Sequence, residues 1–250
     1  MNLNEYEKMA TFEKDYWWHR GRLRLLDTLI GKYAENRTDL KILEVGCGTG
    51  ENAEYLKKYG LVYGMDIADE AIKFCRERGL ERIYKDDLVD IKTPELLEQK
   101  GKFDVILALD VLEHIQDDVA AMSNVKDLLG ENGVFIATVP AHKFLWSEHD
   151  ESLHHKRRYH SLEIKRKLAD AGFEVLRKSY FIVTFFPIIV FYRFWNNIFG
   201  KSAYPKTSYV LLPEAINNFF YKLLQIEAKI IKDFDFPIGT TIVTVAKKLK

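Results

Sequence analysis

Residues 43–50 read LEVGCGTG and place three glycines between an apolar strand and a helix. Gly46, Gly48 and Gly50 tolerate positive φ angles and let the backbone come close to a bound ligand. Their spacing is G-x-G-x-G, whereas a loop that binds a dinucleotide pyrophosphate has the spacing G-x-G-x-x-G. Glu44, near the end of the strand, would repel a pyrophosphate but would suit a ligand that carries an amine or a sulfonium group. This loop predicts an α/β fold with a cofactor site at a strand end.

Short apolar strands alternate with helices along the first 140 residues. The strands are expected at residues 41–45, 61–66, 81–87, 103–109 and 133–140, and the helices at 50–60, 69–79 and 117–129. Such alternation is typical of a parallel sheet with helices on both faces, a doubly wound α/β fold. A helix at 161–171 and two further strands at 173–183 and 239–248 follow. We therefore expect seven strands, with an apolar, α-helical insert before the last one.

Acidic residues follow the second and third strands. Asp66 ends the second strand 20 residues after Gly46, where a carboxylate can accept hydrogen bonds from both hydroxyls of a ribose. Asp86 or Asp87 closes the third strand, where an adenine amine could be met, and the sequence does not separate the two. Together with the glycine loop, these acids indicate a nucleoside cofactor that carries a cationic group.

The charge inventory argues against some classes of protein. The chain has 37 basic and 37 acidic residues, and this balance argues against a general nucleic-acid binder. Residues 1–125 hold 18 Lys/Arg and 25 Asp/Glu, whereas residues 126–250 hold 19 and 12, so an acidic half precedes a basic half. Two cysteines, Cys47 and Cys75, are too few for a disulfide scaffold, and the first residues do not read as a signal peptide. Both observations favour a cytoplasmic location.

Four strings between Lys41 and Pro140 resemble class I S-adenosylmethionine-dependent methyltransferases: LEVGCGTG, GMDIAD, KDDL and ALDVLEHI, each in the expected order and element. The resemblance implies that the glycine loop holds the methionine part of S-adenosylmethionine and that the second-strand acid holds its ribose. It also implies a mostly parallel sheet with an antiparallel last strand. By resemblance, the cofactor-binding residues are Arg22, Glu44, Gly46, Cys47, Gly48, Gly50, Asp66, Ile67, Asp86, Asp87, Leu88, Leu109 and Asp110.

The flanking segments divide the chain further. Residues 1–40, with a helix expected over 3–35, form a cap that by resemblance lies over the cofactor site, although its aromatic cluster is also compatible with ordinary packing. Residues 41–178 are the cofactor-binding domain, and residues 236–250 supply the final strand. Three flanking strings resemble a methyltransferase subgroup that is often associated with polysaccharide, lipid or secondary-metabolite pathways. They lie at 16–26, 140–160 and 236–248.

Methyl transfer is an in-line displacement at a sulfonium carbon, so the site must place a nucleophile behind the methyl group and exclude water. A general base is needed only where the acceptor is protonated, as a hydroxyl is. Open α/β sheets bind ligands at the carboxyl ends of their strands, and the polar loop 141–160 follows the fifth strand there. The candidate bases are His114, His154, His155 and Tyr159.

Loop 141–160 contains five of the seven histidines of the chain. Their separations match no common zinc pattern, and we therefore predict no metal. We expect the loop to cover the substrate and its arginines to bind an anionic group; the alternative is a plain solvated loop. The candidate substrate-binding residues are Trp18, Trp146, Arg157 and Arg158.

Residues 179–235 form an apolar insert, and nine of the 22 residues from 179 to 200 are aromatic. No acid occurs between Ser179 and Pro213, a composition that suits an anionic headgroup surface when basic residues accompany it. A spanning helix needs about 20 apolar residues, and this segment is interrupted before that length. It is either the core of an enlarged substrate lobe or a membrane-surface element or acyl-chain channel. Its basic residues are Arg193, Lys201 and Lys206.

The sequence therefore predicts an S-adenosylmethionine-dependent methyltransferase that methylates an oxygen of a hydrophobic, lipid-linked, saccharide or secondary-metabolite acceptor. One alternative is a methyltransferase of a small soluble acceptor, and another is a non-catalytic S-adenosylmethionine-binding module. The glycine spacing disfavours a nicotinamide-dependent oxidoreductase. The expected partner is a small-molecule or lipid-linked acceptor, with a membrane surface as an open alternative and no nucleic acid. The sequence does not predict an oligomeric state.

Overall fold

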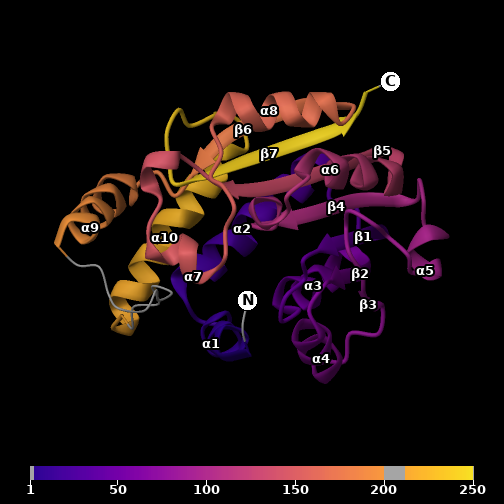
Figure 1. Ribbon diagram of the computed structural model, residues 1–250, viewed down its shortest axis with the longest axis horizontal. Coiled ribbons are helices and arrows are strands. Elements are labelled where there is room, and N and C mark those ends of the chain that lie inside the picture. The colour runs from indigo at the N-terminus through magenta and orange to yellow at the C-terminus, as the bar shows by residue number, and fades with distance from the viewer. Residues whose placement is uncertain (1–2, 200–211, 250) are drawn as a thin grey trace.

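The computed structural model describes residues 3–199 and 212–249 (Figure 1). Seven strands form one sheet in the order β3-β2-β1-β4-β5-β7-β6, and β7 runs antiparallel to both of its neighbours. This arrangement confirms the expected fold class, including the antiparallel last strand. The strands are β1 (Leu40–Val45), β2 (Gly60–Asp66), β3 (Ile83–Lys85), β4 (Phe103–Leu109), β5 (Leu129–Pro140), β6 (Phe173–Phe181) and β7 (Thr241–Lys248).

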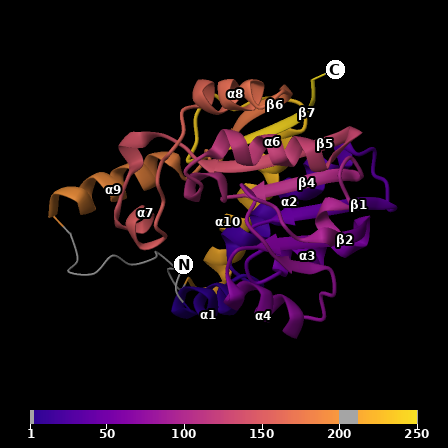
Figure 2. The ribbon, with the colours of Figure 1, turned by 45° about the vertical axis from the view of Figure 1, so that its right-hand side comes forward.

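Helices cover both faces of the sheet (Figures 1 and 2). One face packs against α2, α3, α4 and α10, and the other packs against α5, α6 and α8. The α-helices are α1 (Leu3–Phe12), α2 (Trp17–Tyr33), α3 (Glu51–Leu56), α4 (Asp69–Glu77), α5 (Pro94–Leu97), α6 (Asp118–Leu128), α7 (Glu148–Ser152), α8 (Ser161–Asp170), α9 (Phe186–Phe199) and α10 (Glu214–Ile231). Three short 3-10 helices are η1 (Lys57–Tyr59), η2 (Leu112–His114) and η3 (Lys143–Leu145).

Strand β4 shows why the central strands are apolar on both faces. Val105 and Leu107 point into the core below one layer of helices, whereas Ile106 and Ala108 point into the core below the other. All four side chains are fully buried because successive residues of a strand face opposite sides of a sheet that is covered twice.

The observed strand ends lie within four residues of the expected ones, and two of the differences have a clear cause. Strand β3 ends at Lys85 instead of residue 87, because the Asp86 carboxylate accepts backbone N–H groups of the following loop and turns the chain away from the sheet. Strand β5 begins at Leu129 instead of residue 133, because Leu129 pairs with the first residue of β4.

The carboxyl edge of the parallel strands carries backbone strain. Asp110, His142 and Ile182 follow β4, β5 and β6, and each has a positive φ angle, +56°, +61° and +59°. Non-glycine residues in this region cost about 1–3 kcal/mol each and cluster at functional sites. The strain marks this edge of the sheet as the candidate site.

Helix α9 lies at the end of the molecule beyond α7, far from the β3 edge of the sheet, in both ribbon views (Figures 1 and 2). Within residues 3–199 and 212–249, no helix has the length and apolar character that crossing a bilayer requires.

Candidate active site

The glycine loop connects β1 to α3 at the carboxyl edge of the sheet. Gly46, Gly48 and Gly50 all have positive φ angles, +65°, +54° and +83°. A Cβ atom at position 46 would lie 2.4 Å from the side chain of Val111, which follows β4, so the turn requires glycine there. The backbone N–H of Gly46 donates to the carbonyl oxygen of Met65 at 2.8 Å and ties the loop to β2.

Two polar side chains beside the loop each have a buried atom without a hydrogen-bond partner among the described residues. Glu44 is 1% exposed; its Oε1 accepts from Asn52 at 2.7 Å, whereas its Oε2 has no partner among the described residues. Burial raises the pKa of Glu44 to about 7. Arg22 pairs with Asp110 at 3.3 Å, but its Nε has no partner in the described part of the chain. These two atoms can bind the ammonium and the carboxylate of one amino acid.

Asp66 ends β2 next to the glycine loop. Its Oδ2 accepts from the N–H of Gly48 at 3.0 Å and its Oδ1 from the N–H of Ala68 at 3.0 Å, so the backbone fixes the orientation of the carboxylate. Each oxygen keeps a second lone pair that can accept from a ribose hydroxyl. Ile67 is exposed beside it, and Leu109 is buried at the end of β4.

The structure distinguishes the two acids that follow β3. Asp86 accepts the backbone N–H groups of Asp87, Lys92 and Thr93 at 2.9, 3.0 and 2.7 Å. Burial opposes ionisation of Asp86, but these hydrogen bonds outweigh it and lower its pKa. Asp86 therefore shapes its own loop, whereas Asp87 is exposed and Leu88 beside it is buried. Asp87 Oδ1 accepts from the N–H of Val89 at 2.9 Å, which leaves Oδ2 for an adenine amine.

These residues fit S-adenosylmethionine. Glu44 and Arg22 match its amino-acid part, and Asp66 matches its ribose. The thiol of Cys47 is buried against that of Cys75, with 3.7 Å between the sulfur atoms. Cys47 can therefore contribute to a cofactor site through its backbone rather than its side chain.

The amino-terminal segment reaches the same loop. The helix expected over residues 3–35 is two helices, α1 and α2, and the turn between them carries Glu13. Glu13 is buried, accepts from the Thr49 hydroxyl and pairs with Arg78, which also pairs with Glu51 at 2.9 Å. Glu13 and Thr49 were not predictable from the sequence, because their partners lie far along the chain and no local spacing links them.

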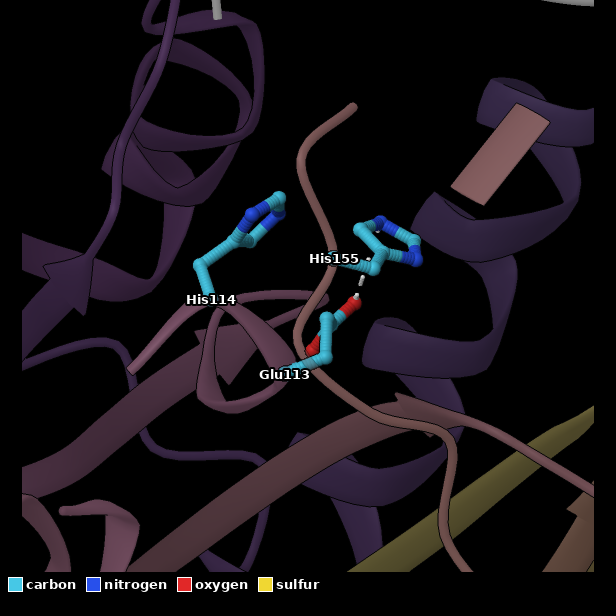
Figure 3. A group of neighbouring side chains, drawn as sticks. All are labelled: Glu113, His114 and His155. Carbon is cyan, nitrogen blue, oxygen red and sulfur yellow. Dashed lines mark ion pairs between the residues drawn. The ribbon is translucent and has the colours of Figure 1, made fainter. Parts of the chain in front are cut away.

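Two of the four candidate bases meet at the carboxyl edge. The rings of His114 and His155 lie 4.8 Å apart, edge to face (Figure 3). His155 Nδ1 lies 2.9 Å from Asp150 Oδ1, and its Nε2 lies 4.0 Å from Glu113 Oε1. Burial, together with the neighbouring His155, lowers the pKa of His114 to about 4. The His114 imidazole is therefore neutral near pH 7.

Tyr159 and His154 lie in surroundings that differ from the expectation. Tyr159 is fully buried; its hydroxyl donates to Asp118 Oδ2 at 2.7 Å and also lies 3.0 Å from the carbonyl oxygen of Leu112. Burial and the bond to Asp118 raise the pKa of Tyr159, so this phenol holds its proton inside the core. His154 is exposed on the loop, with a φ angle of +57°. Neither side chain joins the group around His155.

The two loop arginines bind protein groups instead of facing outward. Arg158 is buried; its Nε donates to Asp150 at 2.7 Å and its Nη1 to the carbonyl oxygen of Ala141 at 2.9 Å. Arg157 lies 3.2 Å from Asp118 and donates to the carbonyl oxygen of Gln116 at 2.8 Å. Because the loop folds back on the ends of β4 and β5, these guanidinium groups hold its shape and are not directed at an anionic ligand.

The two candidate tryptophans lie on different sides of the site. Trp18 is half-buried on α2, and the guanidinium of Arg22 lies over its ring, 4.5 Å from the centroid. Trp146 is half-buried directly after η3, next to α7. Trp18 is therefore near the predicted cofactor residues, whereas Trp146 belongs to the loop that covers the carboxyl edge.

Glu113, His114 and His155 each offer one atom that could bind a metal ion, and these atoms lie within 4.8 Å of one another (Figure 3). Glu113 is fully buried, both its oxygens lack hydrogen-bond partners in the described residues, and burial raises its pKa well above its usual value. The histidine spacing within the loop did not reveal this group, since two of its members follow β4. The prediction that the chain uses no metal stays a prediction.

Curated relatives share part of this sequence. The ubiquinone biosynthesis O-methyltransferase of Pasteurella multocida is 32% identical over an alignment that covers 55% of this chain and 63% of the relative. The enzyme of the same name from Xylella fastidiosa is 33% identical, with 54% and 59% covered. The chain thus aligns with about three fifths of the length of the curated relatives it matches.

Solved structures share the fold over most of the chain. A TehB-like S-adenosylmethionine-dependent methyltransferase from Corynebacterium glutamicum has a TM-score of 0.58 at 18% identity and covers 98% of this chain and 95% of its own. Phosphoethanolamine N-methyltransferase 2 of Haemonchus contortus, in complex with S-adenosylmethionine, has a TM-score of 0.57 at 16% identity, with 89% and 51% covered. Residues 17–178 match the family model described as a methyltransferase domain. The chain therefore belongs to the methyltransferase-domain family, among the class I S-adenosylmethionine-dependent methyltransferases.

Proposed function

We propose that the protein is an S-adenosylmethionine-dependent O-methyltransferase that acts on a hydroxyl group of a hydrophobic, lipid-linked acceptor. The observation that carries this proposal is the pair of unused atoms beside the glycine loop, Glu44 Oε2 and Arg22 Nε. S-adenosylmethionine is the cofactor of the family, and its amino-acid part offers the ammonium and carboxylate groups that these atoms can bind. Transfer to oxygen is supported by the curated relatives, which are named ubiquinone biosynthesis O-methyltransferases.

Residues of the chain would bind the cofactor, orient it and deprotonate the hydroxyl group of the acceptor. When bound, the cofactor would supply a methyl group that its sulfonium activates toward nucleophiles. Glu44 and Arg22 would hold the amino-acid part and Asp66 the ribose, so the orientation of the cofactor would be set by β1, β2 and α2. His114 and His155 lie at the strand ends where an acceptor would enter, and either imidazole could accept the hydroxyl proton as the oxygen attacks.

The surface of α9 supports a lipid-linked acceptor at a membrane interface. Ile188, Phe191, Tyr192 and Trp195 recur at helical spacing, and these side chains are 54–67% exposed. No acidic residue lies between Ser179 and Pro213. An exposed aromatic face without acids suits the headgroup region of an anionic membrane, which would also present a lipid acceptor to the site.

Calorimetry with S-adenosylhomocysteine, followed by transfer of a labelled methyl group into a cell extract separated into lipid and aqueous pools, tests this function. We expect S-adenosylhomocysteine to bind and the label to enter the lipid pool. A chain that binds no S-adenosylhomocysteine would contradict the cofactor assignment. A chain that binds it but labels neither pool would be a non-catalytic binding module.

Flotation with vesicles of equal parts phosphatidylglycerol and phosphatidylcholine tests the membrane part separately. We expect the protein to float with these vesicles and not with pure phosphatidylcholine. A protein that stays in the dense fraction while it labels the aqueous pool would be a methyltransferase of a small soluble acceptor. Helix α9 would then serve only to cover the acceptor site.

A further inference from the structure

Helix α9 turns aromatic residues outward and its single charged residue inward. Arg193 is the only charged residue of α9, and its side chain is 17% exposed. Its guanidinium donates to the carbonyl oxygen of Leu145, in η3, and to Asp150 Oδ2, in α7, at 3.4 Å. The expectation that Arg193 belongs to a headgroup surface is wrong, because its charge is buried against the loop that covers the candidate site.

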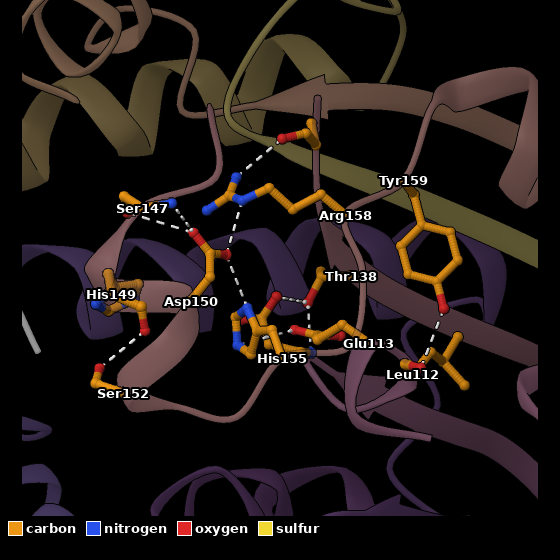
Figure 4. A network of polar contacts seen from close by, with 12 residues as sticks. Leu112, Glu113, Thr138, Ser147, His149, Asp150, Ser152, His155, Arg158 and Tyr159 are labelled. Carbon is orange, nitrogen blue, oxygen red and sulfur yellow. Dashed lines mark hydrogen bonds and ion pairs between the residues drawn. The ribbon is translucent and has the colours of Figure 1, made fainter. Parts of the chain in front are cut away.

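Asp150 is the acceptor that the loop and α9 share. Figure 4 shows its contacts within the loop, with Ser147, His155 and Arg158. Its Oδ1 accepts from Arg158 at 2.7 Å and lies 2.9 Å from His155 Nδ1, and its Oδ2 accepts from the N–H of Ser147 at 2.9 Å. The contact with Arg193 is the longest of these. Asp150 therefore keeps its partners within the loop, including His155, when Arg193 leaves.

The segment from η3 to α7 closes the site as it stands. Two side chains of α7 lie against His155: Asp150, 2.9 Å from its Nδ1, and His149, with 6.4 Å between the ring centroids. With them in place the side chain of His155 is 6% exposed and Glu113 beside it is fully buried, so little of His155 is open to an acceptor. Arg193 ties both ends of the segment to α9. Burial, together with the nearby charge of Arg158, lowers the pKa of Arg193 to about 10. The contact between Arg193 and Asp150, at 3.4 Å, is longer than the contacts that Asp150 makes with Arg158 and His155, so Asp150 stays paired when this contact is released.

We propose that Arg193 is a latch that holds the η3–α7 segment closed over His155 until α9 meets an anionic lipid surface. This inference rests on the proposed function, since it needs an acceptor that reaches His155 from a membrane. Insertion of the aromatic face of α9 would draw the helix away from η3 and withdraw Arg193 from Asp150. His155 would stay hydrogen-bonded to Asp150, so the base would remain oriented while the segment opens.

Chemical labelling of His155 tests the latch without measuring turnover. Diethyl pyrocarbonate modifies accessible imidazoles, and peptide mass spectrometry gives the rate at each histidine. We expect Arg193→Gln to raise the rate at His155 about tenfold, as loss of a charged hydrogen bond would. Vesicles of equal parts phosphatidylglycerol and phosphatidylcholine should raise the wild-type rate similarly and leave the variant unchanged. The control variant Arg37→Gln removes an exposed partner of Asp104, at the amino end of β4 and away from His155. Its His155 should be labelled at the wild-type rate.

The rate of methyl transfer into the lipid pool distinguishes opening of the η3–α7 segment from unfolding of the protein, since unfolding would also expose His155. Without vesicles, Arg193→Gln should transfer methyl groups about tenfold faster than the wild type, close to the rate of the wild type with vesicles. Its affinity for S-adenosylhomocysteine should equal that of the wild type. A misfolded variant would lose both. The latch would be contradicted if His155 of Arg193→Gln were labelled at the same rate as in the wild type. It would also be contradicted if vesicles left the labelling rate of the wild-type protein unchanged. Failure of the wild type to bind S-adenosylhomocysteine would overturn the proposed function instead, and the labelling result would still decide the latch.

Discussion

At the scale of single residues, we expect Glu44 to link cofactor binding to pH. Burial raises its pKa from 4.5 to about 7, so the folded chain favours the neutral carboxyl group. The contribution of Glu44 to the free energy of unfolding is therefore fully present below about pH 4.5 and is lost as the pH rises through 7. A cationic ligand reverses this preference, because an ammonium beside Oε2 favours the ionised form.

The affinity for S-adenosylhomocysteine, which carries the same ammonium, should therefore rise with pH. We expect an increase of about tenfold per pH unit below pH 7 and a plateau above it, since binding must release the proton of Glu44. Calorimetry across this range, in buffers of different ionisation enthalpy, measures both the affinity and the released proton. Glu44→Gln should bind more weakly and lose the slope; a variant that keeps the slope would assign it to another group.

Asp66 should contribute to the affinity through hydrogen bonds from the ribose. Asp66→Asn keeps the size of the side chain but removes its charge and half of its acceptor capacity, so we expect cofactor affinity to fall about tenfold to a hundredfold. Asp69→Asn is the matched control: it lies in the next helix, is exposed and pairs with Lys85 at 2.6 Å. Calorimetry should give wild-type affinity for Asp69→Asn, and equal losses in both variants would contradict the ribose role.

Sequence reasoning predicted residues whose role follows from a local pattern and missed residues whose role depends on distant partners. The spacing of the glycine loop placed Glu44 correctly beside it, because strand and loop are continuous in the chain. It could not tell Asp86 from Asp87, since the difference arises from backbone N–H groups several residues later. Tyr159 was a candidate base because nothing local shows that its hydroxyl donates a hydrogen bond to Asp118 inside the core.

At the scale of elements, the packing of α2 against α10 depends on one glycine. A Cβ atom at Gly21 would lie 2.3 Å from Cδ1 and 2.8 Å from Cβ of Leu224, whereas one at Gly31 would meet only the end of the Asn36 side chain. We expect Gly21→Ala to lower the free energy of unfolding by about 1–3 kcal/mol. Gly31→Ala, in the same helix, should leave it unchanged or raise it by up to about 1 kcal/mol. Urea denaturation followed by circular dichroism compares the two, and equal effects would contradict the packing argument.

The aromatic face of α9 should determine vesicle binding. Replacing Phe191 and Trp195 together with serine removes two exposed aromatic side chains that would enter the interface, each contributing about 2 kcal/mol when buried. We expect vesicle affinity to fall at least about tenfold in a flotation assay. Leu162→Ser changes an equally exposed apolar residue on α8 and should bind vesicles like the wild type. Equal binding by all three proteins would place the lipid contact elsewhere.

At the scale of the whole molecule, the alternation of strands and helices predicted a doubly wound parallel sheet, but it did not predict where the insert lies in space. The amino-terminal and carboxyl-terminal helices meet through contacts that span about 200 residues: the backbone N–H of Trp17 donates to Asn217 at 2.9 Å, and Arg20 donates to Asn218 at 2.8 Å. Glu227 of α10 accepts the N–H groups of Val183 and Thr184 before α9. No local pattern encodes such pairs. The composition therefore could not predict which face of α9 is exposed or that the Arg193 side chain points toward the protein.

The separation of the two ends of the sheet predicts that cofactor and lipid bind independently. The residues proposed for the cofactor come from α2 and from the ends of β1, β2, β3 and β4, whereas α9 follows the end of β6, the strand at the far edge. The latch acts on His155 and on none of the residues assigned to the cofactor. Because coupling between two sites is reciprocal, vesicles should change the affinity for S-adenosylhomocysteine by less than about twofold, and S-adenosylhomocysteine should change vesicle affinity equally little. Calorimetry with vesicles and flotation with saturating S-adenosylhomocysteine measure the two sides. A larger, equal change on both sides would mean that opening of the η3–α7 segment also moves the glycine loop, and the site would then work as one unit rather than two.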